Sequence, residues 1–286
     1  MKVYREGWDH FGTFADVYGL RKLPAEPSTV VCYIAFLEGS GLGGRANTFV
    51  CAISWFHNRE GAPDPVQDKR VKMALAGLRK TLAEERNGEK LVREPFPIEA
   101  LRKWTENPQR FSVVRRFRDP AMIAIGIRCM RRPGELTELR RRNVCFEDGR
   151  VKIFLEKSKT DQLRVGRWLN VDAVPGSSTC PVLLLKRHMD TVSFRGKDDY
   201  LFSTSTGSQL STSAVSDVVR NMVRAAGMKV NASGHSLRIA GATLAVKAGW
   251  EMAEICAVGG WRSDAVLRYM RDCAVAEKGG SSSMGF

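Results

Sequence analysis

Apolar residues recur at helical spacing along most of this chain, and the spacing changes between residues 144 and 171. Residues 144–146, 151–155 and 167–171 have the length and composition of short strands. Turn-forming residues at 147–149 and 158–161 separate these strands. The sequence therefore predicts a mainly α fold with a small antiparallel β-sheet, which is an α+β class.

A polar stretch at residues 84–97 has the composition of a linker and separates two groups of helical segments. It predicts a helical domain over residues 1–92 and a second domain, which contains the sheet, over residues 97–286. In the second domain, Asp119 is expected to cap a helix that has Pro120 at its first position. Helices are expected at residues 30–37, 46–57, 68–85, 98–104, 120–130, 212–226, 236–248 and 251–258, and after residues 181 and 264.

The chain is strongly basic. It contains 45 lysines and arginines against 31 acidic residues, which gives a formal net charge of +14. This surplus favours a polyanionic partner, because cations that displace condensed counterions from phosphates bind strongly. The charge indicates a nucleic-acid-binding protein, and a basic enzyme or ribosome-associated protein without chemistry on DNA is the alternative.

The seven cysteines are scattered singly, and no pair has the C-x-x-C spacing of a zinc site. The amino-terminal residues lack the apolar run of a signal peptide, and no apolar stretch approaches the length of a membrane span. We therefore expect a reduced, soluble, intracellular protein with no bound metal and no membrane partner.

Five motifs follow one another in the second domain. They are Arg132-Pro-Gly-Glu-Leu136, Lys159 in the second turn, His235-Ser-Leu-Arg238, Gly259-Gly-Trp261 and Tyr269. Their order and intervals resemble the catalytic residues of the tyrosine recombinase (phage-integrase) family. The eight-residue interval from Trp261 to Tyr269 is similar to that of the subgroup carried by eukaryotic DIRS-type and crypton mobile elements.

The resemblance spans nearly the whole chain and implies a helical core-binding domain followed by a tyrosine-recombinase catalytic domain. It implies an enzyme that breaks and rejoins double-stranded DNA through a 3′-phosphotyrosine, without cofactor, metal or nucleotide, and that self-associates on DNA. A type IB topoisomerase and a catalytically silent DNA-binding protein derived from a mobile element are the alternatives. The expected location is the nucleus in a eukaryote, and otherwise the cytoplasm or nucleoid.

The residue types fit phosphodiester cleavage, in which charge develops on two non-bridging oxygens. Arg132 and Arg238 can each clamp these oxygens with forked donors, which a lysine cannot do. His235 lies one helical turn before Arg238, so it can face the same phosphate and transfer a proton. Glu135, one turn after Arg132, is expected to orient that guanidinium from behind.

The remaining candidates supply the nucleophile and the proton for the leaving group. The phenol of Tyr269 has an ordinary pKa of about 10 and becomes an effective nucleophile beside cations and a base. Lys159 can protonate the leaving 5′-oxygen from its turn. Trp261 offers an indole N–H donor and an apolar wall.

Several assignments leave alternatives open. Arg132 is preferred to its neighbour Arg131 because it gives the Arg-x-x-Glu-Leu motif, and Lys157 competes with Lys159. Taken singly, each motif also fits a surface ion pair, a solvated turn or a core aromatic. Further basic residues are either DNA contacts or side chains with ordinary solvated or packing roles: Lys69, Arg70, Arg140, Arg141 and Arg142.

Overall fold

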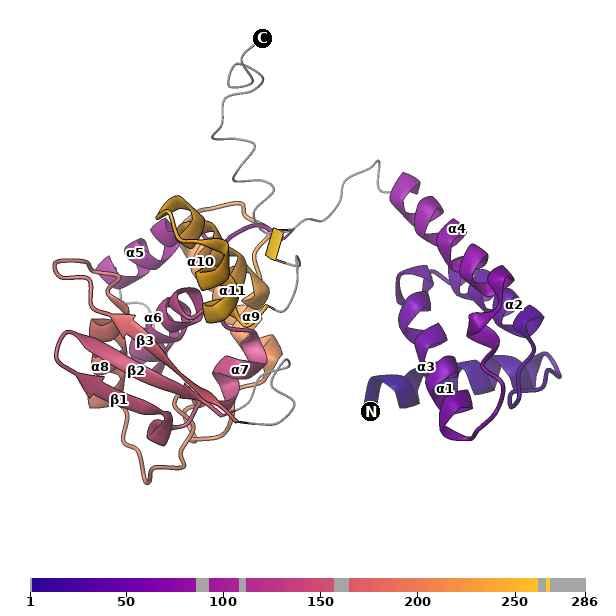
Figure 1. The fold of residues 1–286 in the computed structure, drawn as a ribbon, viewed down its shortest axis with the longest axis horizontal. Helices are drawn as coiled ribbons and strands as arrows, with labels where there is room; N and C mark the ends of the chain where they lie inside the picture. The colour runs from indigo at the N-terminus through magenta and orange to yellow at the C-terminus, as the bar shows by residue number, and fades with distance from the viewer. Residues whose placement is uncertain (1, 86–92, 108–111, 157–164, 262–265, 268–286) are drawn as a thin grey trace, which may run out of the picture. The chain divides into compact units, whose positions relative to one another are not determined.

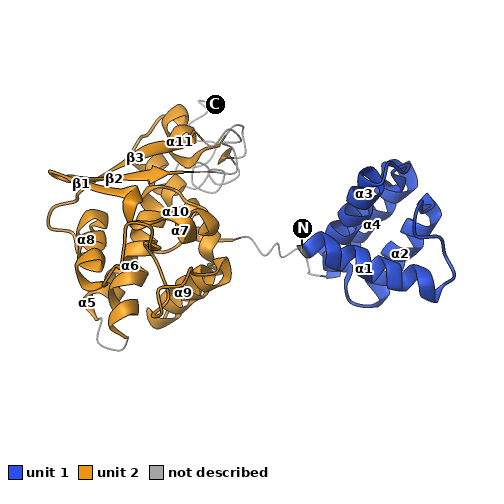
Figure 2. Ribbon diagram, turned by 90° about the horizontal axis from the view of Figure 1, so that it is seen from below, with its two compact units in different colours: residues 1–91 blue, residues 92–286 orange. Residues whose placement is uncertain are grey.

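The computed structural model describes residues 2–85, 93–107, 112–156, 165–261 and 266–267 (Figure 1). The chain divides into two compact units, residues 1–91 and residues 92–286 (Figure 2). Among the described residues, no helix is both long and apolar enough to cross a membrane. The assignment of DNA binding to the first unit and of catalysis to the second remains a prediction.

The described part of the first unit is helical. A cluster of aromatic rings fills its core, where the ring of Tyr33 lies 5.1 Å from that of Phe11 and 5.0 Å from that of Phe14. The buried His57 accepts a hydrogen bond of 2.8 Å from the backbone N–H of Ala25, which ties the third helix to the loop before the second. The elements are α1 (Lys2–Val17), α2 (Pro27–Gly39), η1 (Gly43–Arg45), α3 (Ala46–Arg59), η2 (Pro65–Gln67) and α4 (Lys69–Glu85).

The second unit is mostly helical and contains an antiparallel sheet with the strand order β1-β2-β3. Its central helix is α6, which packs against α8 and α10 and is buried from Arg118 to Ile127. The predicted fold class is therefore confirmed. The elements are α5 (Ile98–Glu106), α6 (Val113–Arg128), α7 (Pro133–Glu138), η4 (Arg141–Asn143), β1 (Val144–Glu147), β2 (Arg150–Leu155), β3 (Arg167–Asp172), α8 (Pro181–Thr191), α9 (Thr212–Ala225), α10 (Gly234–Lys247) and α11 (Met252–Gly259).

The sheet has one buried face, as the alternating pattern of its strands predicts. In β2, Val151, Ile153 and Leu155 are buried, while the residues between them, Lys152 and Phe154, are half-buried. Leu155 is also the last residue of β2, and it pairs with Arg167, the first residue of β3. The buried face packs with the surrounding helices into one core, so the sheet holds the end of β2 and the start of β3 at a defined place.

The prediction that Asp119 caps a helix beginning at Pro120 is wrong. Helix α6 begins at Val113, and Pro120 lies inside it. Asp119 is fully buried, and its carboxylate accepts hydrogen bonds of 2.8 and 2.7 Å from the guanidinium of Arg118. This pairing offsets the cost of burying both charges. Arg118 and Asp119 can therefore lie within a buried helix, at the position where the sequence pattern indicates the start of a helix.

The close approach of α10 to α6 requires Gly241. A Cβ atom at this position would lie 2.2 Å from the carbonyl oxygen of Ile127. We expect Gly241→Ala to lower the free energy of unfolding by about 1–3 kcal/mol, because the two helices must move apart. Thermal unfolding checks this, with Gly196→Ala as the control, since a Cβ atom there would meet nothing within 4 Å. Equal melting temperatures for the two variants would show that α10 and α6 can accommodate the added Cβ atom without loss of stability.

Candidate active site

Three of the predicted site residues lie at the starts of two neighbouring helices. Arg132 directly precedes α7, while His235 and Arg238 belong to the beginning of α10. The two starts touch, because a Cβ atom on Gly234 would lie 2.5 Å from Cγ of Pro133. The structure therefore brings together side chains that are about a hundred residues apart in the sequence.

Arg132 is fastened to Glu135 at two points. Its guanidinium donates from Nη1 to Oε1 at 2.9 Å, and its backbone N–H donates to Oε2 at 3.0 Å. The Arg132 side chain is 28% exposed, against 9% for Glu135. The carboxylate thus restrains one side of the guanidinium and leaves part of it open to an external anion.

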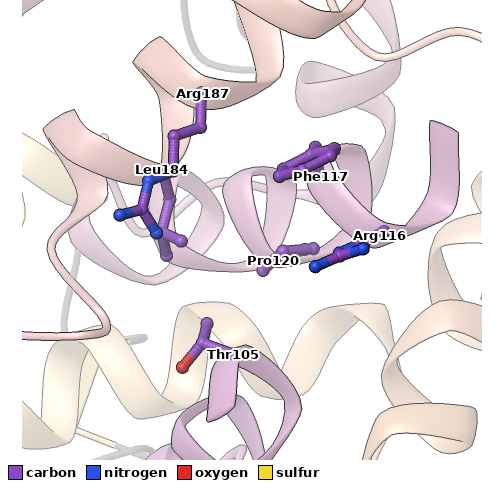
Figure 3. Close-up of a pocket in the computed structure, with 6 residues that line it drawn as sticks. All are labelled: Thr105, Arg116, Phe117, Pro120, Leu184 and Arg187. Carbon is purple, nitrogen blue, oxygen red and sulfur yellow. The ribbon is translucent and has the colours of Figure 1, made fainter. Parts of the chain in front are cut away.

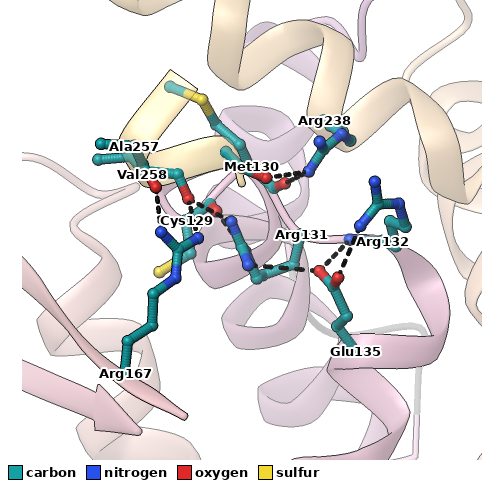
Figure 4. Close-up of polar contacts among 10 residues, drawn as sticks. Cys129, Met130, Arg131, Arg132, Glu135, Arg167, Arg238, Ala257 and Val258 are labelled. Atoms are coloured by element: carbon teal, nitrogen blue, oxygen red, sulfur yellow. Dashed lines mark hydrogen bonds and ion pairs between the residues drawn. The ribbon is translucent and has the colours of Figure 1, made fainter. Parts of the chain in front are cut away.

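The neighbouring Arg131 faces the interior. It is only 1% exposed, and it donates hydrogen bonds to the carbonyl oxygens of Cys129 and Val258 (Figure 4). Its Nη1 also lies 3.4 Å from the carboxylate of Glu135. This difference in exposure favours Arg132 over Arg131 for contact with a phosphate, and Glu135 connects the two arginines.

Arg238 joins three segments of the second unit. Its Nη1 donates to the carbonyl oxygens of Met130 at 2.7 Å and of Gly259 at 2.6 Å. Its guanidinium also lies over the indole of Trp261, 3.7 Å from the ring centroid, which is a cation–π contact. Arg238 is 1% exposed, so a phosphate reaches it only after a covering group moves.

His235 lies in a positive environment. Burial is the main cause that lowers the pKa of its imidazole below the ordinary value of 6.5. The positive charges of Arg238, Arg132 and Arg93 lower the pKa further, because a proton on the ring would add a fourth cation. His235 is therefore uncharged at neutral pH, which suits it to accept a proton.

An NMR titration of the His235 ring should give a pKa below 6.5. In Arg93→Gln this pKa should rise, because one of the cations that oppose protonation is removed, while burial keeps it below 6.5. Arg150→Gln is the control, since Arg150 pairs with Asp172 on the sheet and is not among the charges that act on His235. An unchanged His235 pKa in Arg93→Gln would contradict this electrostatic link.

Arg93 was not predicted from the sequence, because it lies at the edge of the polar stretch that has linker composition. The structure places the residues next to it beside the start of α10. The backbone N–H of Glu94 donates to the Asn231 carbonyl at 3.2 Å, and that of Phe96 donates to the Ser236 carbonyl at 3.1 Å. No local motif signals such a pairing across the sequence.

The predicted DNA contacts in the second unit have partners within the chain. The guanidinium of Arg140 lies 4.4 Å from the ring centroid of Tyr200, and Arg142 lies 2.9 Å from the carboxylate of Glu156. Arg141 is exposed. Contact of Arg140 or Arg142 with DNA would compete with these partners, and the DNA-binding role of all three stays a prediction.

The two candidates in the first unit lie at the start of α4. Lys69 is its first residue and is exposed. Arg70 is exposed too, and its guanidinium donates two hydrogen bonds of 3.0 and 3.1 Å to the carboxylate of Asp68. Their DNA-binding role also stays a prediction.

Lys159, its competitor Lys157 and Tyr269 lie outside the described residues. Within the part of the chain that the structure describes, no three histidine, cysteine or acidic side chains lie together as a metal site.

A pocket of about 160 Å³ lies among α5, α6 and α8 (Figure 3). It is lined by Thr105, Arg116, Phe117, Pro120, Leu184 and Arg187, none of which is a predicted site residue. Pockets that bind small molecules usually enclose about 300–1,000 Å³, so we assign no ligand to this one.

Arg167 is a second residue that the sequence did not indicate. It opens β3, and its guanidinium donates to the carbonyl oxygens of Ala257 and, at 2.8 Å, of Val258 (Figure 4). An arginine in a strand with alternating pattern indicates a solvated side chain, so its contact with α11 could not be expected from the pattern.

Residues 98–274 match the phage integrase family, a span of more than half the chain. The chain belongs to the phage integrase family. It is therefore a tyrosine recombinase, an enzyme that breaks and rejoins DNA strands, which confirms the class predicted from the motifs. The narrower resemblance to DIRS-type and crypton elements stays a prediction.

The chain is similar in sequence to two known recombinases and similar in fold to a solved recombinase structure. An integrase/recombinase xerD homolog from Selenomonas ruminantium is 28% identical over 257 residues, which cover 86% of this chain and 73% of that protein. Recombinase cre of Escherichia phage P1 is 25% identical over 276 residues, with 87% and 77% covered. The fold is similar to that of the XerH site-specific recombinase bound to palindromic difH substrate, with a TM-score of 0.63, 16% identity, and 91% of this chain and 72% of that chain covered.

Proposed function

We propose that this recombinase binds the scissile phosphate of a specific DNA site at the adjoining starts of α7 and α10. The observation that carries the proposal is the convergence of Arg132, His235 and Arg238 there, with Trp261 against Arg238. Several cations close together, one of them partly exposed, favour a phosphate. The same cations stabilise the charge that grows on its non-bridging oxygens during reaction.

In the proposed cleavage step, the phenolic oxygen of Tyr269 bonds to phosphorus, and the bond from phosphorus to the 5′-oxygen breaks. The uncharged His235 accepts the phenolic proton, and Lys159 donates a proton to the leaving 5′-oxygen. The products are a 3′-phosphotyrosine and a 5′-hydroxyl. Attack by a 5′-hydroxyl reverses the step and releases Tyr269. One phosphodiester replaces another, so the exchange needs no metal or nucleotide as a source of energy.

The two catalytic arginines act from different positions. Arg132 is partly exposed and braced by Glu135, so it meets the phosphate first. Arg238 is buried between two carbonyl oxygens and the Trp261 ring, so it contributes after the groups around it shift. Trp261, whose ring lies against the guanidinium of Arg238, thus sets the position of that guanidinium.

The proposal includes a multimer on duplex DNA. The XerH structure holds a palindromic DNA substrate, and a palindromic site matches a protein assembly with two-fold symmetry. For this chain, the net charge of +14 supports binding to DNA. The first unit would hold the duplex, with Lys69 and Arg70 at the start of α4 as candidate contacts. Its place of action is wherever the DNA resides, the nucleus in a eukaryote and otherwise the nucleoid.

Gly259→Ala should slow cleavage about tenfold or more, because a displaced catalytic group costs about that much. A Cβ atom at this position would lie 1.7 Å from Cζ3 of Trp261, so the indole must leave its place on Arg238. Single-turnover cleavage measures the effect, and Gly196→Ala, which meets nothing within 4 Å, is the control. Cleavage by Gly259→Ala at the unaltered rate would show that the position of Trp261 does not affect the cleavage rate.

The experiment that tests the proposed function traps the covalent intermediate on DNA of random sequence. The protein is incubated in EDTA with a pool of nicked duplexes that carry random sequence around the nick, so that cleavage releases a short strand and prevents rejoining. We expect a covalent adduct, with DNA attached through its 3′-phosphate to Tyr269 on peptide mapping. Sequencing the trapped DNA then gives the preferred site.

Two outcomes would oppose the proposal. Absence of any adduct, or an adduct at a residue other than Tyr269, would remove the proposed mechanism. With the site known, strand exchange between two DNA molecules distinguishes a recombinase from a topoisomerase-like enzyme, which relaxes supercoils without exchange.

A further inference from the structure

The carboxyl end of α11 is held by three arginines from three different segments. Arg131, which follows α6, donates to the carbonyl oxygen of Val258. Arg238, on α10, donates to that of Gly259 at 2.6 Å. Arg167, on β3, donates to those of Ala257 and Val258. Figure 4 shows the side chains of Arg131 and Arg167 reaching the same end of this helix from different sides.

This end of a helix attracts cations for a physical reason. The last carbonyl groups of a helix have no partner within it, and the aligned peptide dipoles add a partial negative charge there. A guanidinium has forked donors and satisfies two such carbonyls at once. Gly260, in the left-handed conformation, ends α11, and the arginines hold the carbonyl groups of its last turn.

Among these arginines, Arg167 alone comes from the sheet. It is the first residue of β3 and pairs with Leu155, the last residue of β2. The core holds that part of the sheet, because Leu155 is buried. Two residues beyond α11 lies Trp261, whose ring contacts the catalytic Arg238, and Tyr269 follows eight residues later in the sequence. Arg167 thus contacts the last turn of α11, and Trp261 lies two residues beyond the end of that helix.

We propose that Arg167 is a positioning residue for DNA cleavage, which fixes the end of α11 against the sheet and thereby sets the place of Trp261 beside Arg238. The inference rests on the proposed function, since cleavage is the reaction that it affects. Arg167 itself touches no DNA in this role, so its loss should slow the reaction without weakening DNA binding.

The test compares Arg167→Gln with the unaltered protein on a trapped, cognate nicked duplex. We expect single-turnover cleavage at saturating protein to fall about 10- to 100-fold, because a small displacement of catalytic groups has an effect of this size. The Kd for the same DNA should stay within about twofold, as no phosphate contact is removed. Arg167→Lys keeps the charge but can reach only one carbonyl well, so its rate should be intermediate.

Two controls separate positioning from a general loss of structure. Arg150→Gln removes an exposed arginine from the same sheet, one that pairs with Asp172, and should cleave at the unaltered rate. The double variant of Arg167→Gln and Trp261→Ala should cleave no more slowly than the slower single variant, because both changes interrupt one chain of contacts. If the rate reductions of the two single variants multiplied in the double variant, the proposal would be overturned.

The other outcomes are equally decisive. Cleavage by Arg167→Gln at the unaltered rate would overturn the inference, as would a Kd that weakens in parallel with the rate. If Arg167→Gln does not fold, Arg167→Lys decides: an intermediate rate with unchanged Kd supports the inference, and an unaltered rate overturns it. Failure of the unaltered protein to form an adduct would instead count against the proposed function.

Discussion

Replacing Tyr269 with phenylalanine should abolish the covalent protein–DNA adduct. The phenolic oxygen is the atom that bonds to phosphorus in the proposed step, and phenylalanine lacks it, so the loss should exceed about 10⁴-fold and reach the limit of detection. Binding of the duplex should be nearly unchanged, because one oxygen atom contributes little beside the many phosphate contacts of a basic protein. A gel assay of trapped adduct and a fluorescence anisotropy assay of binding measure the two quantities.

Tyr18→Phe is the matched control for this variant. Tyr18 follows α1 in the first unit and is 58% exposed, so removal of its hydroxyl should leave adduct formation unchanged. Adduct formation by Tyr269→Phe at the unaltered level would show that another residue is the nucleophile, and peptide mapping of that adduct would identify it.

The elements of this fold are largely accessible from the sequence, because their signals are local. The alternation along β2 directly predicts its buried face. The helix expected from residue 212 begins there, and the hydroxyl of the preceding Ser211 caps it by accepting a hydrogen bond of 3.1 Å from the backbone N–H of Ala214. The prediction for Asp119 is wrong because aspartate is by type a good capping residue. In the structure Asp119 lies inside α6, where the guanidinium of Arg118 donates hydrogen bonds to its buried carboxylate.

The site shows the same division between local and distant contacts. The link between Arg132 and Glu135 is an i,i+3 contact, which sequence spacing predicts directly. The contacts of Arg238 with Met130 and Gly259 join residues that are 108 and 21 positions apart. The motif indicates that Arg238 is catalytic, but it contains no information that the side chain is buried against Trp261.

Arg167 illustrates why some functional candidates stay hidden. Its partners are backbone carbonyls, which every residue has, so no pairing of side-chain types marks the contact. Its distance in sequence from those carbonyls is 90 and 91 residues. Only the folded arrangement, which brings the end of α11 within reach of the first residue of β3, makes an ordinary strand arginine a candidate link to the proposed site.

Replacing Arg132 with lysine should reduce single-turnover cleavage about 10²- to 10³-fold, as does the loss of one donor that stabilises transition-state charge. Lysine keeps the positive charge but cannot hold two phosphate oxygens with a planar fork, and it cannot keep the bracing contact with Glu135 in the same geometry. The Kd for DNA should change by less than about threefold, because one phosphate contact is weakened and the charge is retained.

Arg128→Lys provides the comparison for Arg132→Lys. Arg128 ends α6 four residues earlier and is exposed, so the same substitution there should leave the cleavage rate unchanged. If both lysine variants cleaved at the unaltered rate, charge alone would suffice at position 132 and the clamp would have to come from Arg238. If Arg132→Lys instead weakened DNA binding and left the cleavage rate of the bound complex unchanged, Arg132 would contribute to binding the ground state of the DNA rather than to its cleavage. Only the loss of an interaction that strengthens in the transition state slows the reaction of the bound complex.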